Sequence, residues 1–191
     1  MVLLCVIDTE TTGLGIFNKG SPRHDDYPVS VGAVVADVDI DHREITCLDS
    51  MYSLVRIPDP SRAEDTFFIH GITQEEIERA PMPGEVCERI LSMKKIHGFD
   101  YAGAWNHQFD KYFMRKLFKL SKVRELPMNW IEMQPRKFAK LDDYVPRIVC
   151  DEIKCMPGHN ALNDCYRALG VYATLGGFEI KMDMVVEIQK K

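Results

Sequence analysis

The chain has 191 residues, of which 46% are hydrophobic and 28% are charged, and its 24 basic and 29 acidic residues give a formal net charge of −5. This length suits one domain with a substantial core, and the composition is ordinary for a globular protein. The acidic balance excludes a tight, sequence-independent duplex binder with a basic face, and no apolar run approaches the ~20 residues of a membrane span.

Three strands are expected first. Leu3–Asp8 is short and almost entirely apolar, which predicts a buried strand, and the absence of a basic start argues against a signal peptide. Pro28–Val38 is rich in valine and alternates weakly, and Glu44–Val55 carries spaced apolar residues before two prolines.

The rest of the chain alternates helical and extended patterns. Thr73, followed three residues later by Glu76, predicts a capping box and a short helix that runs to Arg79 and ends at Pro81. The tail Phe178–Ile188 favours neither structure. The other expected elements are helices over Gly84–Ile96, His107–Leu120, Gln134–Asp143 and Ala161–Leu175, and strands over Tyr101–Trp105 and Asn129–Met133. This order predicts an α/β fold, with a mixed sheet flanked by helices in a single domain over residues 1–191.

Two carboxylates close the first strand. Asp8 and Glu10 are two residues apart, so on an extended segment both point to the same face, as a shared metal ion would need. Asp8 directly follows apolar residues and is therefore expected at the mouth of the core. The alternative is a solvated acidic turn.

Two further acidic residues are expected near the starts of helices. Asp110 alone would be explained as a residue favoured by the helix dipole. Asp164 lies five residues after His159, which follows Pro157-Gly158. That spacing would let the histidine lie over a metal held by Asp164, and a neutral imidazole can accept a proton from water.

The three acidic runs resemble the motifs of the DEDDh family of 3′→5′ exonucleases. The matching runs are Asp8-Thr9-Glu10, Asn106 to Asp110, and His159-x-Ala161-x-x-Asp164, in the family's order. Ile69–Thr73 is similar to a segment that many members carry between the first two motifs. The resemblance covers roughly residues 1–175. It implies a ribonuclease H-like fold, with a mixed five-stranded sheet whose central strand ends at Asp8 and Glu10.

The resemblance also implies the roles of the site residues. Asp8, Glu10 and Asp164 would hold one Mg²⁺ or Mn²⁺ ion, Asp8 would bridge to a second ion, and Asp110 would bind through water. Hard oxygen ligands suit these two metals. His159 would activate the attacking water. The residues expected to contact the terminal nucleotide are Thr11, Leu14, His70, Asn106 and Phe109, although Leu14 and Phe109 could equally be core residues.

The expected activity is metal-dependent 3′→5′ cleavage of single-stranded DNA ends to nucleoside 5′-monophosphates. DNA or RNA 3′ ends are the expected substrates, a polymerase or other replication protein is a candidate partner, and no membrane is involved. One alternative is a 3′→5′ exoribonuclease of the same fold. Another is a non-catalytic nucleic-acid-binding or polymerase-subunit module, which would have no need of four mutually repelling carboxylates.

Two other segments allow alternative interpretations. Cys150, Cys155 and His159 could form a zinc site, but the spacing is loose and a fourth ligand is not evident. The six scattered cysteines instead predict reduced thiols in a cytoplasmic protein. Gly15–Tyr27 is longer than the usual family connection. It is either a floppy surface loop or a lid whose Lys19, Arg23 and His24 contact phosphate.

Overall fold

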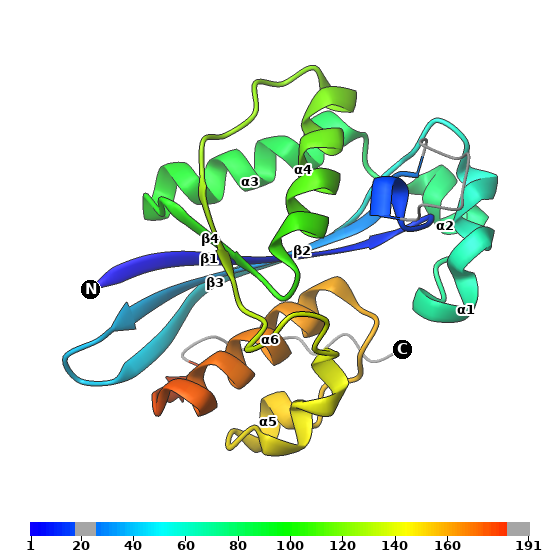
Figure 1. Cartoon of the computed structure of the whole chain (residues 1–191). Helices are drawn as coiled ribbons and strands as arrows, with labels where there is room; N and C mark the ends of the chain where they lie inside the picture. Colours follow the sequence, from blue (N-terminus) through cyan, green and yellow to red (C-terminus); the bar gives the residue numbers. More distant parts are fainter. Residues whose placement is uncertain (18–25, 183–191) are drawn as a thin grey trace.

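A six-stranded mixed sheet forms the centre of the protein (Figure 1). The computed structural model describes residues 1–17 and 26–182. The strand order is β5-β4-β1-β2-β3-β6, in which β1, β2 and β3 are antiparallel neighbours and the other pairs are parallel. The strands are β1 (Val2–Thr11), β2 (Pro28–Asp39), β3 (Glu44–Leu54), β4 (Tyr101–Ala104), β5 (Asn129–Glu132) and β6 (Glu179–Lys181).

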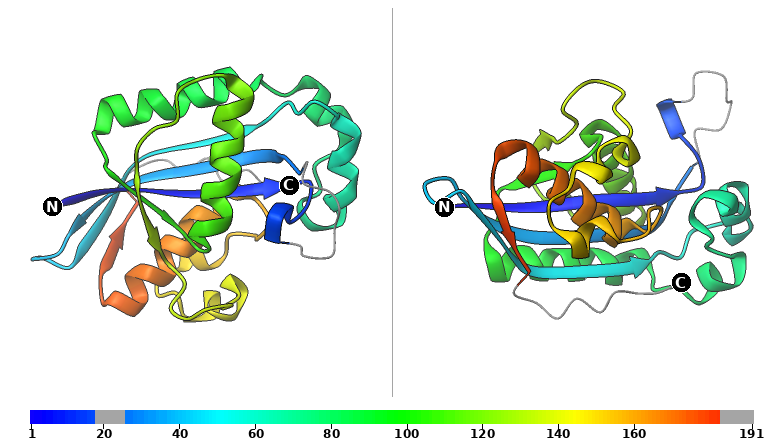
Figure 2. Two further views of the ribbon diagram at one scale, coloured as in Figure 1. Left: turned by 45° about the horizontal axis from the view of Figure 1, so that its top comes forward. Right: turned by 90° about the horizontal axis from the view of Figure 1, so that it is seen from below.

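Helices cover both faces of this sheet. Helices α3 and α4 lie on one face and α5 and α6 on the other, while α1 and α2 lie beyond one end of the central strands (Figures 1 and 2). The α-helices are α1 (Phe67–His70), α2 (Gln74–Arg79), α3 (Pro83–His97), α4 (His107–Ser121), α5 (Asp151–Lys154) and α6 (Ala161–Gly176). Short 3₁₀ helices cover Gly15–Phe17, Pro60–Thr66, Leu141–Asp143 and Val145–Arg147. No helix in the described ranges is long and apolar enough to cross a membrane.

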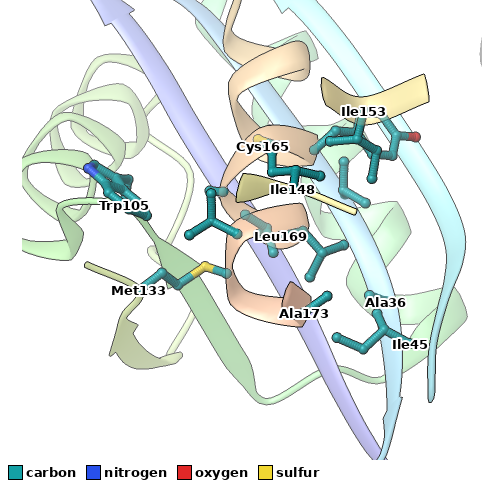
Figure 3. Packing of buried hydrophobic residues seen from close by; sticks show 14 of the residues in the cluster. Ala36, Ile45, Trp105, Met133, Ile148, Ile153, Cys165, Leu169 and Ala173 are labelled. Atoms are coloured by element: carbon teal, nitrogen blue, oxygen red, sulfur yellow. The ribbon is translucent and has the colours of Figure 1, made fainter. Parts of the chain in front are cut away.

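Each face of β1 contributes to a separate core. Cys5 and Ile7 pack with the residues of α3 and α4, whereas Leu4 and Val6 pack with those of α6. Figure 3 shows the α6 side, where Cys165 and Leu169 lie against the sheet. Burial on both faces explains why this strand is an unbroken apolar run.

The structure confirms the mixed α/β sheet flanked by helices but corrects the strand number from five to six. The sixth strand lies in the tail whose structure the sequence left ambiguous, where Ile180 is in register with Ile45 of β3. Strand β1 is also longer than expected. It stays paired with β2 through Glu10, opposite Ser30, to Thr11, opposite Pro28, so both acidic residues lie within the strand.

The capping box is confirmed, because Thr73 and Glu76 exchange side-chain and backbone hydrogen bonds at the start of α2. The predicted helix over Gln134–Asp143 is wrong. Phe138 has φ +64°, which a helix cannot accommodate, and only Leu141–Asp143 forms a short 3₁₀ turn. Helix α1 and the 3₁₀ helix before it were not predicted.

None of the six cysteines forms a disulfide in the structure.

Candidate active site

The acidic site is built where β1 extends past its partner β4. The pairing of these two strands ends at Val6 and Gly103. Asp8 and Glu10 lie beyond that point, and they share the alternation of Leu4 and Val6, whose side chains pack toward α6. Thr9, between them, faces the α4 side. The free edge of β1 is therefore open to the first turns of both α4 and α6.

Gly32 allows α6 to approach this part of the sheet. It is the residue of β2 in register with Asp8. A Cβ atom at this position would overlap with the backbone carbonyl of Ala161 and the backbone nitrogen of Leu162. Only glycine permits that contact, which brings the start of α6 down onto the strand beside Asp8.

The first turn of α6 brings Asp164 to the site. Asn160 caps the helix by accepting hydrogen bonds from two backbone N–H groups. Asp164 is buried, and its Oδ2 accepts the backbone N–H of His159 at 2.9 Å. Potential ligand atoms of Glu10, His159 and Asp164 all lie within 4.8 Å of one another. The first and third motifs, about 150 residues apart in the sequence, thus meet at one point.

Asp110 belongs to α4, which lies on the opposite face of the sheet from α6. It lies in the first turn of α4 and is only 3% exposed. Its Oδ1 accepts a hydrogen bond of 2.9 Å from the Thr9 hydroxyl. Thr9 therefore ties the second motif to the strand that carries the first, a link that the sequence analysis missed.

Burial and mutual repulsion both act on these carboxylates. Burial raises the pKa of Asp8 well above its usual range, and the charges of Asp110, Asp164 and Glu10 raise it further. Burial also raises the pKa of Asp110 to about 8, against the opposing hydrogen bond from Thr9. Three carboxylates that oppose the ionisation of Asp8 form an environment that a divalent cation would relieve.

The donor set fits Mg²⁺ or Mn²⁺. The carboxylate oxygens of Asp8, Glu10, Asp110 and Asp164 are hard ligands of the kind that both ions prefer. His159 is exposed, so its ring can reach a substrate or a water molecule. The arrangement is thus able to combine cation binding with proton transfer.

The loop that carries His159 is held by contacts to α6. Asn163 donates from Nδ2 to the carbonyl of Pro157 at 3.1 Å, and the His159 N–H is bound to Asp164. His159 itself has φ +60°, a left-handed conformation that non-glycine residues rarely adopt. A backbone strained in this way persists only where its surroundings hold it, and such residues cluster at functional sites.

Arg167 is a site residue that the sequence analysis did not identify. Its buried guanidinium donates to Asp164 and to Asp142, and it lies so close to Gly158 that a Cβ there would overlap with it. Burial raises the pKa of Asp164, and the charge of Arg167 opposes that shift. A cation three residues after Asp164 on a helix was the available signal.

The residues expected to contact the terminal nucleotide do not all lie on an accessible surface. Leu14 is 55% exposed, Asn106 is exposed and Phe109 is half-buried, so these three can reach a substrate. The Phe109 ring lies 5.7 Å from that of Phe17, which the sequence analysis did not identify.

His70 and Thr11 are buried instead. Nδ1 of His70 accepts the N–H of Ile72 at 3.0 Å, and its Nε2 lies 2.9 Å from the Thr66 hydroxyl. Thr66 in turn donates to the carbonyl of Thr11 at 2.6 Å. In this arrangement both residues join α1 to the end of β1, and their contact with substrate stays a prediction.

Asp26 binds the start of the long Gly15–Tyr27 connection that follows β1. This buried carboxylate accepts the N–H of Gly15 at 2.8 Å and forms an ion pair with Arg62 at 2.5 Å. The proposed lid residues Lys19, Arg23 and His24 lie outside the described residues.

The zinc alternative is not supported within the described ranges. Cys155 is exposed, and the Sγ of Cys150 donates to Glu152 at 3.3 Å. His159 is grouped with two carboxylates rather than with these thiols.

Comparisons with known proteins identify the family of this chain. The sequence profile of the exonuclease family RNase_T matches residues 5–172. The chain belongs to this exonuclease family. The exonuclease is also 28% identical over 182 residues to the DNA polymerase III subunit epsilon of Pasteurella multocida (strain Pm70), a match covering 90% of this chain and 67% of the relative.

Solved structures share the fold of this exonuclease. A full-length 3′-exonuclease superposes with a TM-score of 0.69 at 18% identity, covering 97% of this chain and 88% of the other. Exonuclease I of E. coli, in complex with a dA16 oligonucleotide, gives a TM-score of 0.66 at 13% identity, covering 93% of this chain and 41% of the other. A 3′-exonuclease described in recognition of a histone mRNA stem-loop gives 0.61 at 18% identity, covering 91% and 62%.

Proposed function

We propose that this exonuclease removes nucleotides one at a time from the 3′ ends of single-stranded DNA and requires a divalent metal. The observation that carries the proposal is the convergence of Glu10, His159 and Asp164, whose potential ligand atoms lie within 4.8 Å of one another beside Asp8. Carboxylates that raise the pKa of Asp8 at an open sheet edge suit a cation site.

In this proposal Asp8, Glu10, Asp110 and Asp164 hold two Mg²⁺ or Mn²⁺ ions. When bound, such ions act as Lewis acids that stabilise charge on the attacking and leaving oxygens of a displacement at phosphorus. His159 accepts a proton from the attacking water. The water oxygen bonds to phosphorus, and the bond from phosphorus to the 3′ oxygen of the preceding nucleotide breaks. The leaving 3′ oxygen takes up a proton from solvent, so the products are a nucleoside 5′-monophosphate and a chain with a new 3′ hydroxyl.

Leu14 and Phe109 are accessible apolar residues that lie close in the sequence to Glu10 and Asp110, respectively. An apolar wedge and an aromatic face can hold a terminal base without reading its identity. That pocket would accept only a free end, so a circular strand should resist cleavage.

The polymerase III epsilon relative supports DNA as substrate and a polymerase as partner. The similarity to a 3′-exonuclease described with an mRNA stem-loop supports an exoribonuclease as the second candidate. Both candidates would use the same acidic site.

Incubating 3′-labelled DNA and RNA oligonucleotides side by side with Mg²⁺, Mn²⁺ or chelator distinguishes the candidates. The proposal expects labelled 5′-mononucleotide as the first product from DNA, only when metal is present. Faster release from RNA would favour the exoribonuclease. Cleavage of a closed single-stranded circle would contradict the exonuclease mechanism.

A further inference from the structure

A cavity opens beside the second motif, Asn106 to Asp110. Its volume is about 510 Å³, within the ~300–1,000 Å³ typical of ligand pockets. Its lining includes Asn106 of the second motif and Phe17, together with Lys137 and Phe138. Because the Phe17 ring lies 5.7 Å from that of Phe109, the cavity lies next to the pocket expected for the terminal base.

Phe138 is unusual in both its exposure and its backbone conformation. Its side chain is 84% exposed, although phenylalanine is normally buried, and its φ of +64° is rare for any residue other than glycine. A strained residue that exposes a large aromatic ring costs stability in the free protein. Such positions are typical of binding sites.

The segment that carries Phe138 is fixed to the second motif. The carbonyl of Ala139 accepts hydrogen bonds from Trp105 Nε1 at 2.8 Å and from Gln134 Nε2 at 3.1 Å. Trp105 directly precedes Asn106 in the sequence. The position of Phe138 is therefore set relative to the acidic site.

The charges around the cavity suit a polyanion. Arg136, Lys137 and Lys140 are all exposed within this segment, in a chain with a net charge of −5. The Lys137 ammonium lies 5.0 Å from the centroid of the Phe138 ring. Glu132 also lines the cavity, and its carboxylate lies 3.0 Å from the Nδ1 of His107. Cations beside an aromatic face are the usual elements of single-strand binding.

We propose that this cavity binds the nucleotide on the 5′ side of the one that is released. Phe138 stacks on its base, and Lys137 contacts the phosphate backbone. The inference rests on the proposed function, and it implies that the enzyme binds a single strand more tightly than a lone terminal nucleotide.

Two substrates separate this subsite from the catalytic centre. The p-nitrophenyl ester of thymidine 5′-monophosphate offers a single nucleoside, whereas a thymidine oligonucleotide also fills the cavity. Phe138→Ala should raise KM for the oligonucleotide about fivefold or more, the loss expected for one stacked base, with kcat nearly unchanged. KM for the ester should not change. Phe138→Trp keeps an aromatic ring and should bind the oligonucleotide as the wild type does. Ile96→Ala, which removes an exposed apolar side chain at the end of α3, should leave both KM values unchanged.

Lys137→Gln tests the charge contact. The slope of log Kd against log salt concentration, measured by anisotropy of a labelled oligonucleotide in chelator, should fall by about 0.7. Lys95→Gln, at the exposed end of α3, is the matched control.

The outcomes distinguish this inference from the proposed function. If the wild type cleaves both substrates but Phe138→Ala leaves the oligonucleotide KM unchanged, or raises both KM values equally, the subsite is refuted and the exonuclease stands. If the wild type cleaves neither substrate but Phe138→Ala weakens oligonucleotide binding fivefold, the subsite stands and the proposed function fails. An absence of oligonucleotide binding by the wild type would overturn the subsite directly.

Discussion

The raised pKa of Asp110 predicts a specific pH dependence of stability in the metal-free protein. Folding raises this pKa from 3.8 to about 8, so between these values the folded state retains a proton that the unfolded chain releases. Stability must therefore fall as pH rises through this window, by about 1.4 kcal/mol per pH unit from this group. The stabilisation from the proton on Asp110 is fully present below pH 3.8, the pKa in the unfolded chain. It is fully lost above about pH 8, the pKa in the folded protein.

Asp110→Asn removes this titration but leaves an amide oxygen that can accept the Thr9 hydroxyl. Between about pH 5 and pH 7 the variant should gain about 2.7 kcal/mol relative to the wild type, which is two pH units at this slope. Urea denaturation in chelator at several pH values measures the difference. Asp41→Asn, in the exposed β2–β3 turn, is the control. If the free energy of unfolding depends on pH equally in Asp110→Asn and in the wild type, the electrostatic reasoning is refuted.

Three further substitutions test separate parts of the site. Gly32→Ala should lower the free energy of unfolding by about 1–3 kcal/mol or more in urea titrations, because the added Cβ pushes α6 away; unchanged stability and activity would contradict the close approach. His159→Ala should cleave slowly, because it removes the group proposed to accept a proton from the attacking water; a wild-type rate would exclude that role. Arg167→Met should destabilise the metal-free protein by about 3–5 kcal/mol, because it leaves Asp164 without its buried partner. Its melting temperature should rise more with Mn²⁺ than that of the wild type, and an equal rise would show that the arginine does not substitute for the cation.

The sequence was informative where a local pattern determines structure. The apolar run of β1, the capping box at Thr73 and the helical spacing of α4 and α6 each depend on neighbouring residues, and each was predicted. The helix expected over Gln134–Asp143 failed because Trp105, far away in the sequence, holds the carbonyl of Ala139 in a non-helical segment.

The acidic residues were found through their resemblance to the family's motifs, but the groups that position them were not found. Arg167 pairs with Asp142 only because α6 packs against the Leu141–Asp143 turn, a long-range contact without a periodic signal. Gly32 could have been suspected, since a glycine within a valine-rich strand often marks close backbone approach. The helix that approaches it could not be identified from the sequence.

The most direct test of the account is the cleavage of a 5′-labelled single-stranded DNA by Asp8→Asn and by the Asp41→Asn control. In Mg²⁺ or Mn²⁺, wild type and control should shorten the strand from its 3′ end to a ladder of products. Asp8→Asn should lose several orders of magnitude in rate, because the proposed function places its carboxylate between both cations. Full activity of Asp8→Asn, or undiminished cleavage by the wild type in chelator, would contradict a metal-dependent site built on these carboxylates.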